Sequence, residues 1–375
     1  MADSGTTKLK KLYQLGQSPW YDNMDRRLIE NGELKSLFDM GIVGVTSNPT
    51  IFEKAINSST VYDEKIKRLK KEGKSLEAIY DELTTDDIRD AADMLKNVYE
   101  ETHGIDGYVS IEVLPSYAHD PFKTIEYARH IFKKVGRKNI MVKVPGTKEA
   151  PLAIRTLIHE DINVNVTLLF SERQYEPVAF AYLEGLTDRV RDGLDISRVA
   201  SVASVFVSRI DTKIDHLFEV FASREANLEK RKKITFLEGK IAVANCKFIY
   251  QKFKDIFSRI DFLDLKSKGG HVQRVLWAST STKNPVYSDC LYVDNLIGPL
   301  TVNTMPHQTV LAFADHGRLS LSLESDLEGA SVYLAQLEEV GINLETIFEE
   351  AQMEGVAAFQ NSFDAIMNSL KAKVV

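Results

Sequence analysis

The sequence predicts an α/β protein built on a single closed (β/α)8 TIM barrel, and three observations favour that fold. Short runs rich in Val, Ile and Leu alternate with charged amphipathic stretches up to about residue 310. The runs are apolar on both faces, as are the strands of a parallel sheet covered by helices. Counted along the chain, they make eight strands, the number that such a barrel requires.

Six of these strands are well marked and two are weaker. The well-marked strands are expected at 41–46, 108–114, 140–144, 162–169, 199–207 and 272–278, and the weaker ones at 18–22 and 300–305. An open, doubly wound sheet is the competing architecture, but its usual GxGxxG turn is absent from the sequence, as is GxxxxGK[ST]. The closed barrel is therefore the favoured fold.

The stretches between the strands carry helix signals. Asp120 before Pro121 combines an N-cap with proline at the first helical position, and this helix is expected to end at Gly136 after two lysines. Residues 84–102 place Ile, Ala, Leu and Tyr side chains along one face and predict a second helix.

Residues 1–375 are predicted to form one barrel domain, because the sequence shows no internal repeat and no linker rich in Pro, Gly or Ser. Extra helices are expected in two places: between strands 6 and 7 at 208–258, and in a C-terminal helical extension at 320–375. The extension is predicted to hold two helices separated by VGIN at 340–343. Whether it covers the active site, packs across the barrel or forms a subunit interface stays open, as does a homo-oligomeric state.

Composition excludes several classes of protein. Hydrophobic residues make up 44% and charged residues 27% of the chain, which is typical of a globular protein and not of a disordered one. The net charge of −7 argues against non-specific binding to nucleic acid or to acidic membranes. The sequence shows no secretory signal and no apolar run of about 18 residues. We expect a cytoplasmic protein with no nucleic-acid or membrane partner.

Metal binding is not expected either. The only cysteines, Cys246 and Cys290, are far apart in the sequence, and the eight histidines are scattered. This cysteine usage is typical of a reducing compartment.

Polar residues at the ends of the predicted strands are the candidates for function, because barrel enzymes place their chemistry at the C-terminal ends of the strands. Side chains two residues apart on a strand share a face. On this basis one polar face is formed by Thr46, Asn48, Ser110, Glu112, Lys143, Asn163, Asn165 and Thr167.

Lys143 is the sharpest candidate of this set. It lies within the apolar run IMVKVP, where burial disfavours a charged ammonium and favours the neutral amine that a Schiff-base nucleophile needs. The same position also fits a lysine that reaches solvent along its aliphatic stem or is held by a carboxylate. Glu112 fits two roles, as the ion partner of Lys143 or as a general acid and base tuned by burial.

The asparagines have structural alternatives. Asn48 precedes Pro49 and could shape a loop rather than bind a ligand. Asn165 and Thr167 lie on one face of one strand, where two buried polar side chains would be costly without partners.

Six motifs occur at the predicted strand ends in a fixed order. They read VTSNPTIF, SIEVLPS, IMVKVPGT, INVNVTLLFS, SVASVFVSRID and LWASTSTKNP. Each motif is weak by itself, but together they resemble the transaldolase family in its longer bacterial form, from about Asp22 to Pro306. The resemblance implies a (β/α)8 barrel, in agreement with the strand count.

The resemblance also implies roles for individual residues. Lys143 would form a Schiff base with the ketose carbonyl, and Glu112 would act as acid and base through a water that Thr167 helps to position. Asp22 would take the proton of the C4 hydroxyl. The remaining matches are to substrate-binding positions, namely Asn48, Asn165, Ser204, Phe206, Arg209 and Ser279.

One departure concerns the phosphate site. Shorter transaldolases have an arginine soon after the serine that matches Ser279, whereas this chain reads TSTKN. Lys283 is the natural substitute, although a lysine cannot make the bidentate phosphate contact of an arginine.

The activity that the resemblance implies needs no cofactor and acts on sugar phosphates. A transaldolase moves dihydroxyacetone from sedoheptulose 7-phosphate to glyceraldehyde 3-phosphate, in the non-oxidative pentose phosphate pathway. Two alternatives remain, a lyase of the fructose-6-phosphate aldolase type and a non-catalytic phosphosugar-binding barrel. The lyases favour Gln at the position of Glu112 and Tyr at that of Phe206, so both positions favour the transferase.

Overall fold

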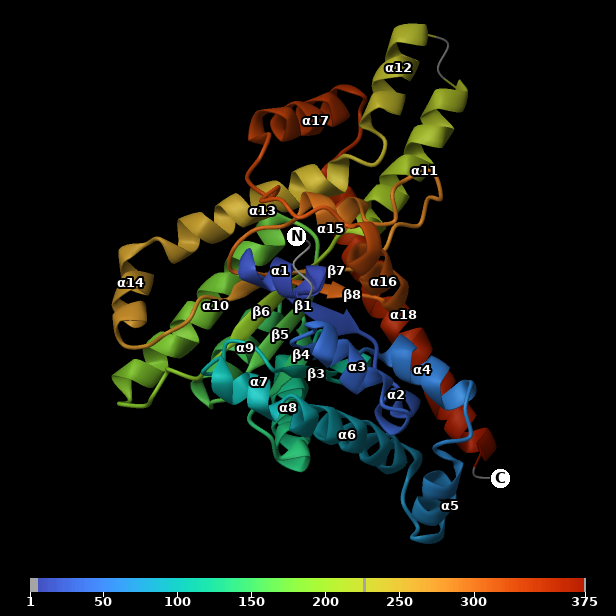
Figure 1. Ribbon diagram of the computed structural model, residues 1–375, viewed down its shortest axis with the longest axis vertical. Coiled ribbons are helices and arrows are strands. Elements are labelled where there is room, and N and C mark those ends of the chain that lie inside the picture. The colour runs from blue at the N-terminus through green and yellow to red at the C-terminus, as the bar shows by residue number, and fades with distance from the viewer. Residues whose placement is uncertain (1–5, 225–226, 374–375) are drawn as a thin grey trace.

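The computed structural model describes residues 6–224 and 227–373, and its centre is a closed barrel of parallel strands surrounded by helices (Figure 1). Neighbouring strands pair in sequence order, and β8 closes the barrel on β1. This confirms the predicted fold and the position of every predicted strand. The strands are β1 (Gln17–Asp22), β2 (Val45–Thr46), β3 (Val109–Glu112), β4 (Ile140–Pro145), β5 (Val164–Leu169), β6 (Ser201–Phe206), β7 (Arg274–Ala278) and β8 (Thr301–Met305).

Helices connect the strands and cover the outside of the barrel. Among the residues described, no helix combines the length and the apolar character that crossing a membrane would need. The helices are α1 (Lys8–Gln14), α2 (Arg26–Glu30), α3 (Glu33–Met40), α4 (Pro49–Asn57), α5 (Asp63–Lys71), α6 (Leu76–Met94), α7 (Lys96–Glu101), η1 (Pro115–Tyr117), α8 (Pro121–Val135), α9 (Ala150–His159), α10 (Glu172–Arg191), α11 (Ser208–Arg224), α12 (Leu228–Leu237), α13 (Ile241–Phe257), α14 (Ile260–Ser267), α15 (Leu291–Asn295), α16 (His307–His316), α17 (Leu327–Glu339) and α18 (Leu344–Lys373).

The two helices predicted from local signals are present. Asp120 caps α8 by accepting a hydrogen bond from the Lys123 backbone N–H at 3.0 Å, and Gly136 ends the helix with a φ of 65°. The helix predicted at 84–102 is in fact two helices, α6 and α7. α6 begins earlier, behind the N-cap Ser75, and the chain leaves regular helical geometry at Leu95.

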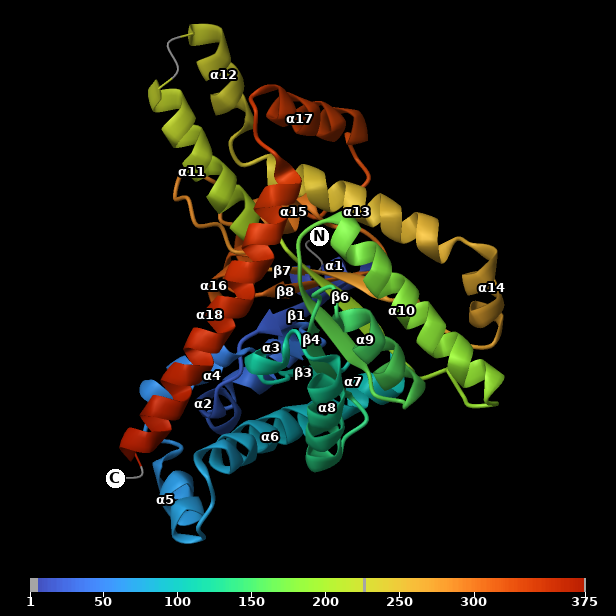
Figure 2. The same ribbon diagram turned by 180° about the vertical axis from the view of Figure 1, so that it is seen from behind.

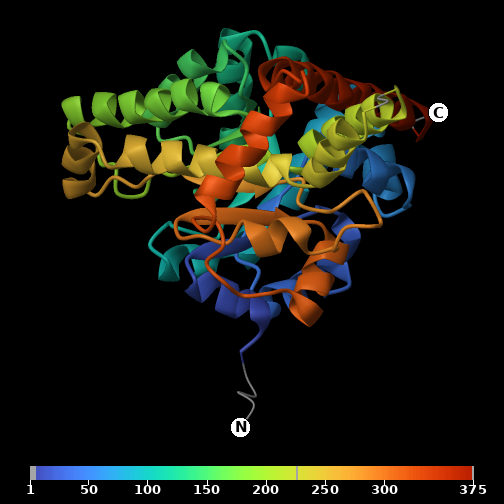
Figure 3. The ribbon, with the colours of Figure 1, turned by 90° about the horizontal axis from the view of Figure 1, so that it is seen from above.

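The extra helices occupy the two predicted places and a third that sequence analysis missed. α11 to α14 lie between β6 and β7, and Figure 3 shows α13 beside α10 on the outside of the barrel. Within 208–258 the charged run ASREANLEKRKK at 222–233 predicts a turn, and this run includes residues 225–226, which lie outside the described residues. α4 and α5 form the unpredicted group, between β2 and the stretch of α6 and α7 in which one helix was predicted. Amphipathic periodicity predicts helices, but does not say how many of them one connection contains.

A buried ion pair closes the N-terminal end of the barrel. The Arg274 guanidinium lies 3.0 Å from an Asp106 carboxylate oxygen, and the two side chains are only 9% and 0% exposed. Asp106 also accepts hydrogen bonds from Ser18 Oγ at 2.7 Å and Trp20 Nε1 at 3.0 Å. The polar side chains at the opposite, C-terminal end are therefore separated from this end by a packed interior.

The C-terminal extension crosses the C-terminal end of the barrel (Figure 2). α18 packs on α4, α11, η1 and the end of β5, whereas α17 packs on α12 and α13. Gln352 of α18 donates hydrogen bonds to the carbonyl oxygens of Gly146 and Leu168, at 2.9 and 3.0 Å. Of the placements that the sequence left open, α18 packs across the C-terminal end of the barrel.

The ion pair between Arg274 and Asp106 at the N-terminal end of the barrel generates a stability prediction. Asp106→Ala leaves the Arg274 charge buried and unpaired, and we expect the free energy of unfolding to fall by about 3–5 kcal/mol. Asp93→Ala is the matched control, because its ion pair with Arg137 is exposed and should contribute about 1 kcal/mol or less. Chemical denaturation of the variants measures both effects, and equal losses would contradict the prediction.

Candidate active site

A pocket of about 340 Å³ opens at the C-terminal ends of the strands, beneath α18. All of the predicted site residues except Glu112 and Asn165 line it. The predicted residues in the lining are Asp22, Asn48, Lys143, Thr167, Ser204, Phe206, Arg209, Ser279 and Lys283. These residues come from distant parts of the chain, and the barrel brings them together as the strand-end argument predicts.

Lys143 and Glu112 form a buried pair at the base of the pocket, where Lys143 is part of the lining. They are direct neighbours in the register of β4 and β3, and Lys143 Nζ lies 3.6 Å from Glu112 Oε2. Lys143 Nζ also donates a hydrogen bond to the Ser47 carbonyl oxygen at 3.0 Å. The two side chains are only 6% and 4% exposed. Lys143 is therefore not a strand-end lysine that reaches into solvent.

Glu112 titrates close to neutral pH. Burial raises the pKa of Glu112 to about 7, although the neighbouring Lys143 opposes this shift. Within the described part of the chain, neither carboxylate oxygen of Glu112 nor Thr167 Oγ1 has a hydrogen-bond partner. Glu112 can therefore both give and take a proton near neutral pH, as a general acid and base must.

Asp22 supplies a second carboxyl group, partly buried at the end of β1. It accepts a hydrogen bond from Thr46 Oγ1 at 2.8 Å, and Thr46 in turn contacts Thr304 Oγ1 at 2.7 Å. Burial raises the pKa of Asp22, while Lys143 acts in the opposite direction. One amine and two carboxyl groups thus meet at the base of the pocket, and the Lys143 charge lowers the pKa of both carboxyl groups against the effect of burial.

Both predicted asparagines make structural hydrogen bonds. Asn165 donates to Ser110 Oγ at 3.0 Å and accepts from Ser204 Oγ at 2.6 Å, which links β3, β5 and β6. Asn48 caps α4 by accepting from the Ile51 backbone N–H at 3.0 Å, and its side chain still lines the pocket. Asn48 therefore has a structural role, but as the N-cap of a helix and not in a loop, and this role is compatible with contact to a ligand.

Three cationic side chains face the outer part of the pocket. They are Arg209 from the first turn of α11, Lys283 from the loop after β7, and Lys54 from α4. Burial lowers the pKa of Lys283, and the positive charges of Lys54 and Arg209 lower it further. Across residues 6–224 and 227–373, none of the three has a carboxylate within 4 Å, so this end of the pocket suits an anion.

Sequence reasoning missed several residues of the lining, and Lys54 and Phe359 are the two that the proposals below use. Lys54 lies two residues beyond VTSNPTIF, and its place on a helix capped by Asn48 at the barrel mouth is a signal that could have identified it. Phe359 belongs to α18, and only the docking of this helix brings its ring to the pocket.

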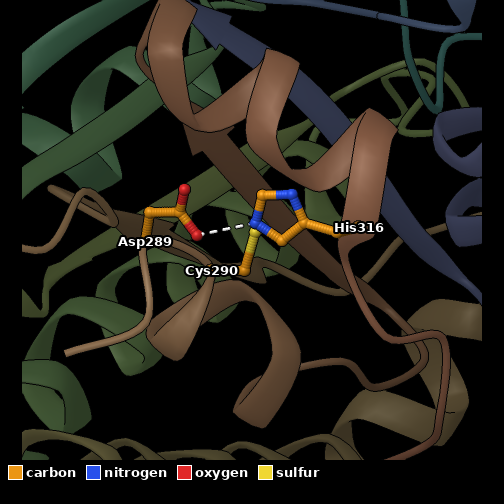
Figure 4. Close-up of side chains that lie close together, drawn as sticks. All are labelled: Asp289, Cys290 and His316. Carbon is orange, nitrogen blue, oxygen red and sulfur yellow. Dashed lines mark hydrogen bonds and ion pairs between the residues drawn. The ribbon is translucent and has the colours of Figure 1, made fainter.

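One group of potential metal ligands lies elsewhere among the described residues, formed by Asp289, Cys290 and His316 (Figure 4). His316 Nε2 lies 2.8 Å from Asp289, and Nδ1 lies 3.0 Å from Asp315. These contacts raise the pKa of His316, and burial raises the pKa of Cys290 to about 12. A metal ion would have to displace the proton of the Cys290 thiol. The ion pairs with Asp289 and Asp315 already account for the position of His316.

The Lys143–Glu112 pair generates a prediction about proton affinity. Lys143→Met removes the positive charge that lowers the pKa of Glu112, so the Glu112 titration should move to higher pH than the wild-type value of about 7. Infrared titration of the carboxyl C=O band measures the midpoint, and Glu112→Gln identifies the band. A midpoint that stays in place or moves to lower pH would show that the two groups are not coupled in this way.

Comparisons with known proteins agree with the geometry of the pocket. A family model described as Transaldolase/Fructose-6-phosphate aldolase matches residues 19–370. A protein named Transaldolase from Trichodesmium erythraeum is 46% identical over 372 residues, which cover 98% of each chain. Transaldolase 2 from Nostoc punctiforme is 45% identical over 373 residues, again covering 98% of each chain. Transaldolase from Saccharopolyspora erythraea is 42% identical over 370 residues, with the same coverage. The chain therefore belongs to the transaldolase/fructose-6-phosphate aldolase family.

Proposed function

We propose that the protein is a transaldolase that moves dihydroxyacetone from sedoheptulose 7-phosphate to glyceraldehyde 3-phosphate, giving erythrose 4-phosphate and fructose 6-phosphate. The observation that carries this proposal is the buried Lys143 amine, 3.6 Å from Glu112, at the base of a pocket whose outer part is cationic. The relatives named Transaldolase, which match along nearly the whole chain, support the same activity.

In the first step Lys143 Nζ attacks the ketose carbonyl. The amine must be neutral to attack, and Glu112 is the nearest group that can take its proton. The resulting carbinolamine loses its hydroxyl as water when the Glu112 carboxyl group returns a proton, through a water oriented by Thr167. The product is an iminium ion, covalently bound to Lys143.

In the second step the C3–C4 bond of the sugar breaks. Asp22 takes the proton of the C4 hydroxyl, and the electron pair of the C3–C4 bond moves toward the positive iminium nitrogen. Burial raises the pKa of Asp22, which makes its carboxylate a stronger base. The aldose phosphate leaves, and the three-carbon fragment stays on the lysine.

In the third step the fragment adds to the aldehyde carbon of a second aldose phosphate, and the protonated Asp22 returns its proton to the new alkoxide. Hydrolysis of the new iminium frees Lys143 and the product ketose. Asn48 holds the hydroxyl groups of the dihydroxyacetone fragment between the two half-reactions, and Asn165, beneath the lining, accepts the hydrogen bond that positions Ser204 beside them. No cofactor takes part in this cycle.

Arg209, Lys283, Lys54 and Ser279 bind the phosphate group of the sugar. Arg209 can contact two phosphate oxygens at once, whereas each lysine acts as a single charge. Two lysines on different elements compensate for the arginine that shorter transaldolases place after the serine. Sugar phosphates are therefore the proposed substrates, and we place the reaction in the cytoplasmic, non-oxidative pentose phosphate pathway.

A lyase that releases free dihydroxyacetone is the second candidate, because the family description includes fructose-6-phosphate aldolase. Glu112 and Phe206 stand where the lyases favour Gln and Tyr, so these positions favour the transferase. With fructose 6-phosphate and erythrose 4-phosphate supplied together, sedoheptulose 7-phosphate should be the main product. An excess of free dihydroxyacetone would favour the lyase instead.

Chemical trapping tests the assignment of the nucleophile. Borohydride reduction in the presence of fructose 6-phosphate should attach a reduced sugar adduct to the peptide that contains Lys143, because it converts the iminium to a stable amine. Peptide mass spectrometry locates the adduct, and the exposed Lys148 on a nearby peptide should stay unmodified. We expect Lys143→Met to abolish both labelling and turnover. Labelling at another lysine, or none in the wild type, would reject the mechanism.

A substitution of Lys54 tests the phosphate site. Lys54→Met removes one positive charge from the outer pocket, so the KM for fructose 6-phosphate should rise about threefold to tenfold while kcat changes little. Steady-state kinetics measure both constants. Lys35→Met is the control, because Lys35 forms an exposed ion pair with Asp39 on α3. An unchanged KM in Lys54→Met would remove Lys54 from the site.

A further inference from the structure

The guanidinium group of Arg209 lies over two aromatic rings. Its central carbon is 5.0 Å from the centre of the Phe206 ring and 6.0 Å from that of Phe359. Both phenylalanines are buried, at 8% and 4% exposure, and both line the pocket. Phe206 is in the barrel strand β6, whereas Phe359 is in α18, so the two rings come from separate parts of the chain.

Other contacts of α18 favour this arrangement. A side chain at Gly355 would place its Cβ 3.2 Å from Arg209 Nη1 and 2.7 Å from Leu168, so the missing side chain lets α18 approach the guanidinium. Glu354 contributes a negative charge near Arg209, but its carboxylate pairs with Lys213 Nζ at 2.6 Å. The N–H groups of Arg209 are thereby left free of a carboxylate partner among the described residues.

α18 is also tied to both helices that carry the cationic side chains. Ser362 Oγ lies 2.8 Å from Thr50 Oγ1 of α4, the helix that carries Lys54. The Lys213 contact joins α18 to α11, the helix that carries Arg209. Phe359 lies between Glu354 and Ser362, the two residues that make these contacts, so this stretch of α18 is held at the pocket.

We propose that Phe359 is a positioning residue for substrate phosphate, and that it acts by holding the Arg209 guanidinium in the orientation that presents its N–H groups to the pocket. This inference rests on the proposed function, because it assigns Arg209 to the phosphate. An arginine without an ion pair would otherwise sample several rotamers, and part of the binding free energy would be spent in ordering it. Contact with the two ring faces restricts this motion and leaves the N–H groups at the edge of the guanidinium available.

Phe359→Leu tests the proposal, since leucine keeps an apolar side chain and removes the ring face. We expect the KM for fructose 6-phosphate to rise about threefold to tenfold, with kcat nearly unchanged. With unphosphorylated fructose as donor, kcat/KM should stay at the wild-type value, because that substrate makes no demand on Arg209. Phe359→Tyr retains the ring and should stay close to wild type for both donors.

Phe363→Leu is the matched control on the same helix. The Phe363 ring is buried like that of Phe359, but it does not line the pocket. It packs edge-on against the Tyr80 ring, with the two ring centres 5.3 Å apart. Its substitution should leave the KM for fructose 6-phosphate unchanged. If Phe359→Leu lowered kcat/KM equally for the two donors, or if both leucine variants behaved alike, Phe359 would be only a packing residue and the proposal would be wrong.

A binding measurement separates this proposal from the proposed function. Titration calorimetry with inorganic phosphate should show about threefold to tenfold weaker binding to Phe359→Leu than to the wild type, whether or not the wild type transfers dihydroxyacetone. Phe359→Met provides a second variant without a ring if the leucine variant does not fold. Equal phosphate affinity in wild type and in the folded ringless variant would overturn the inference, while a wild type that binds phosphate but transfers no dihydroxyacetone would count only against the activity.

Discussion

The contact between Lys143 and Glu112 is the interaction on which the chemistry of this protein depends. A lysine and a glutamate are 3.6 Å apart at adjacent strand ends, with little contact to solvent. Burial of both groups is costly, so such a pair is a poor means of stabilising a fold. Burial does raise the pKa of Glu112 to about 7, against the effect of Lys143, and the pair keeps a proton acceptor beside the amine.

The rest of the barrel makes this buried pair possible. Parallel pairing places Glu112 opposite Lys143, and Lys143 opposite Asn165, so three polar side chains meet inside a closed sheet. Ser47 supplies a carbonyl acceptor for the amine, and Asn165 is itself satisfied by Ser110 and Ser204. The separate polar network around Asp106 closes the other end of the barrel, which leaves only the C-terminal end for substrate.

The helices added to the barrel contribute to the outer part of the pocket. α4 contributes Lys54, α11 contributes Arg209, and α18 contributes Phe359. Contacts of α18 with both other helices join these contributions into one cationic wall. In the proposed function the strand ends hold the reacting groups, and the helical additions bind the charged end of the substrate. The outer pocket is thus locally positive, although the chain as a whole carries a net charge of −7.

The sequence by itself determined the barrel, the number of its strands and about half of the pocket lining. The barrel and the polar strand ends follow from local periodicity: a repeat of two residues separates inward from outward side chains, and parallel strands collect their C-terminal ends at one rim. The remaining predicted residues of the lining, among them Asp22 and Arg209, came from the family resemblance. The tertiary structure alone decided which bonds these side chains make. Burial, rather than residue type, brings the pKa of Glu112 to about 7. The place of Phe359 at the pocket depends on how α18 packs on the barrel, and no local pattern in the chain records a distance between elements.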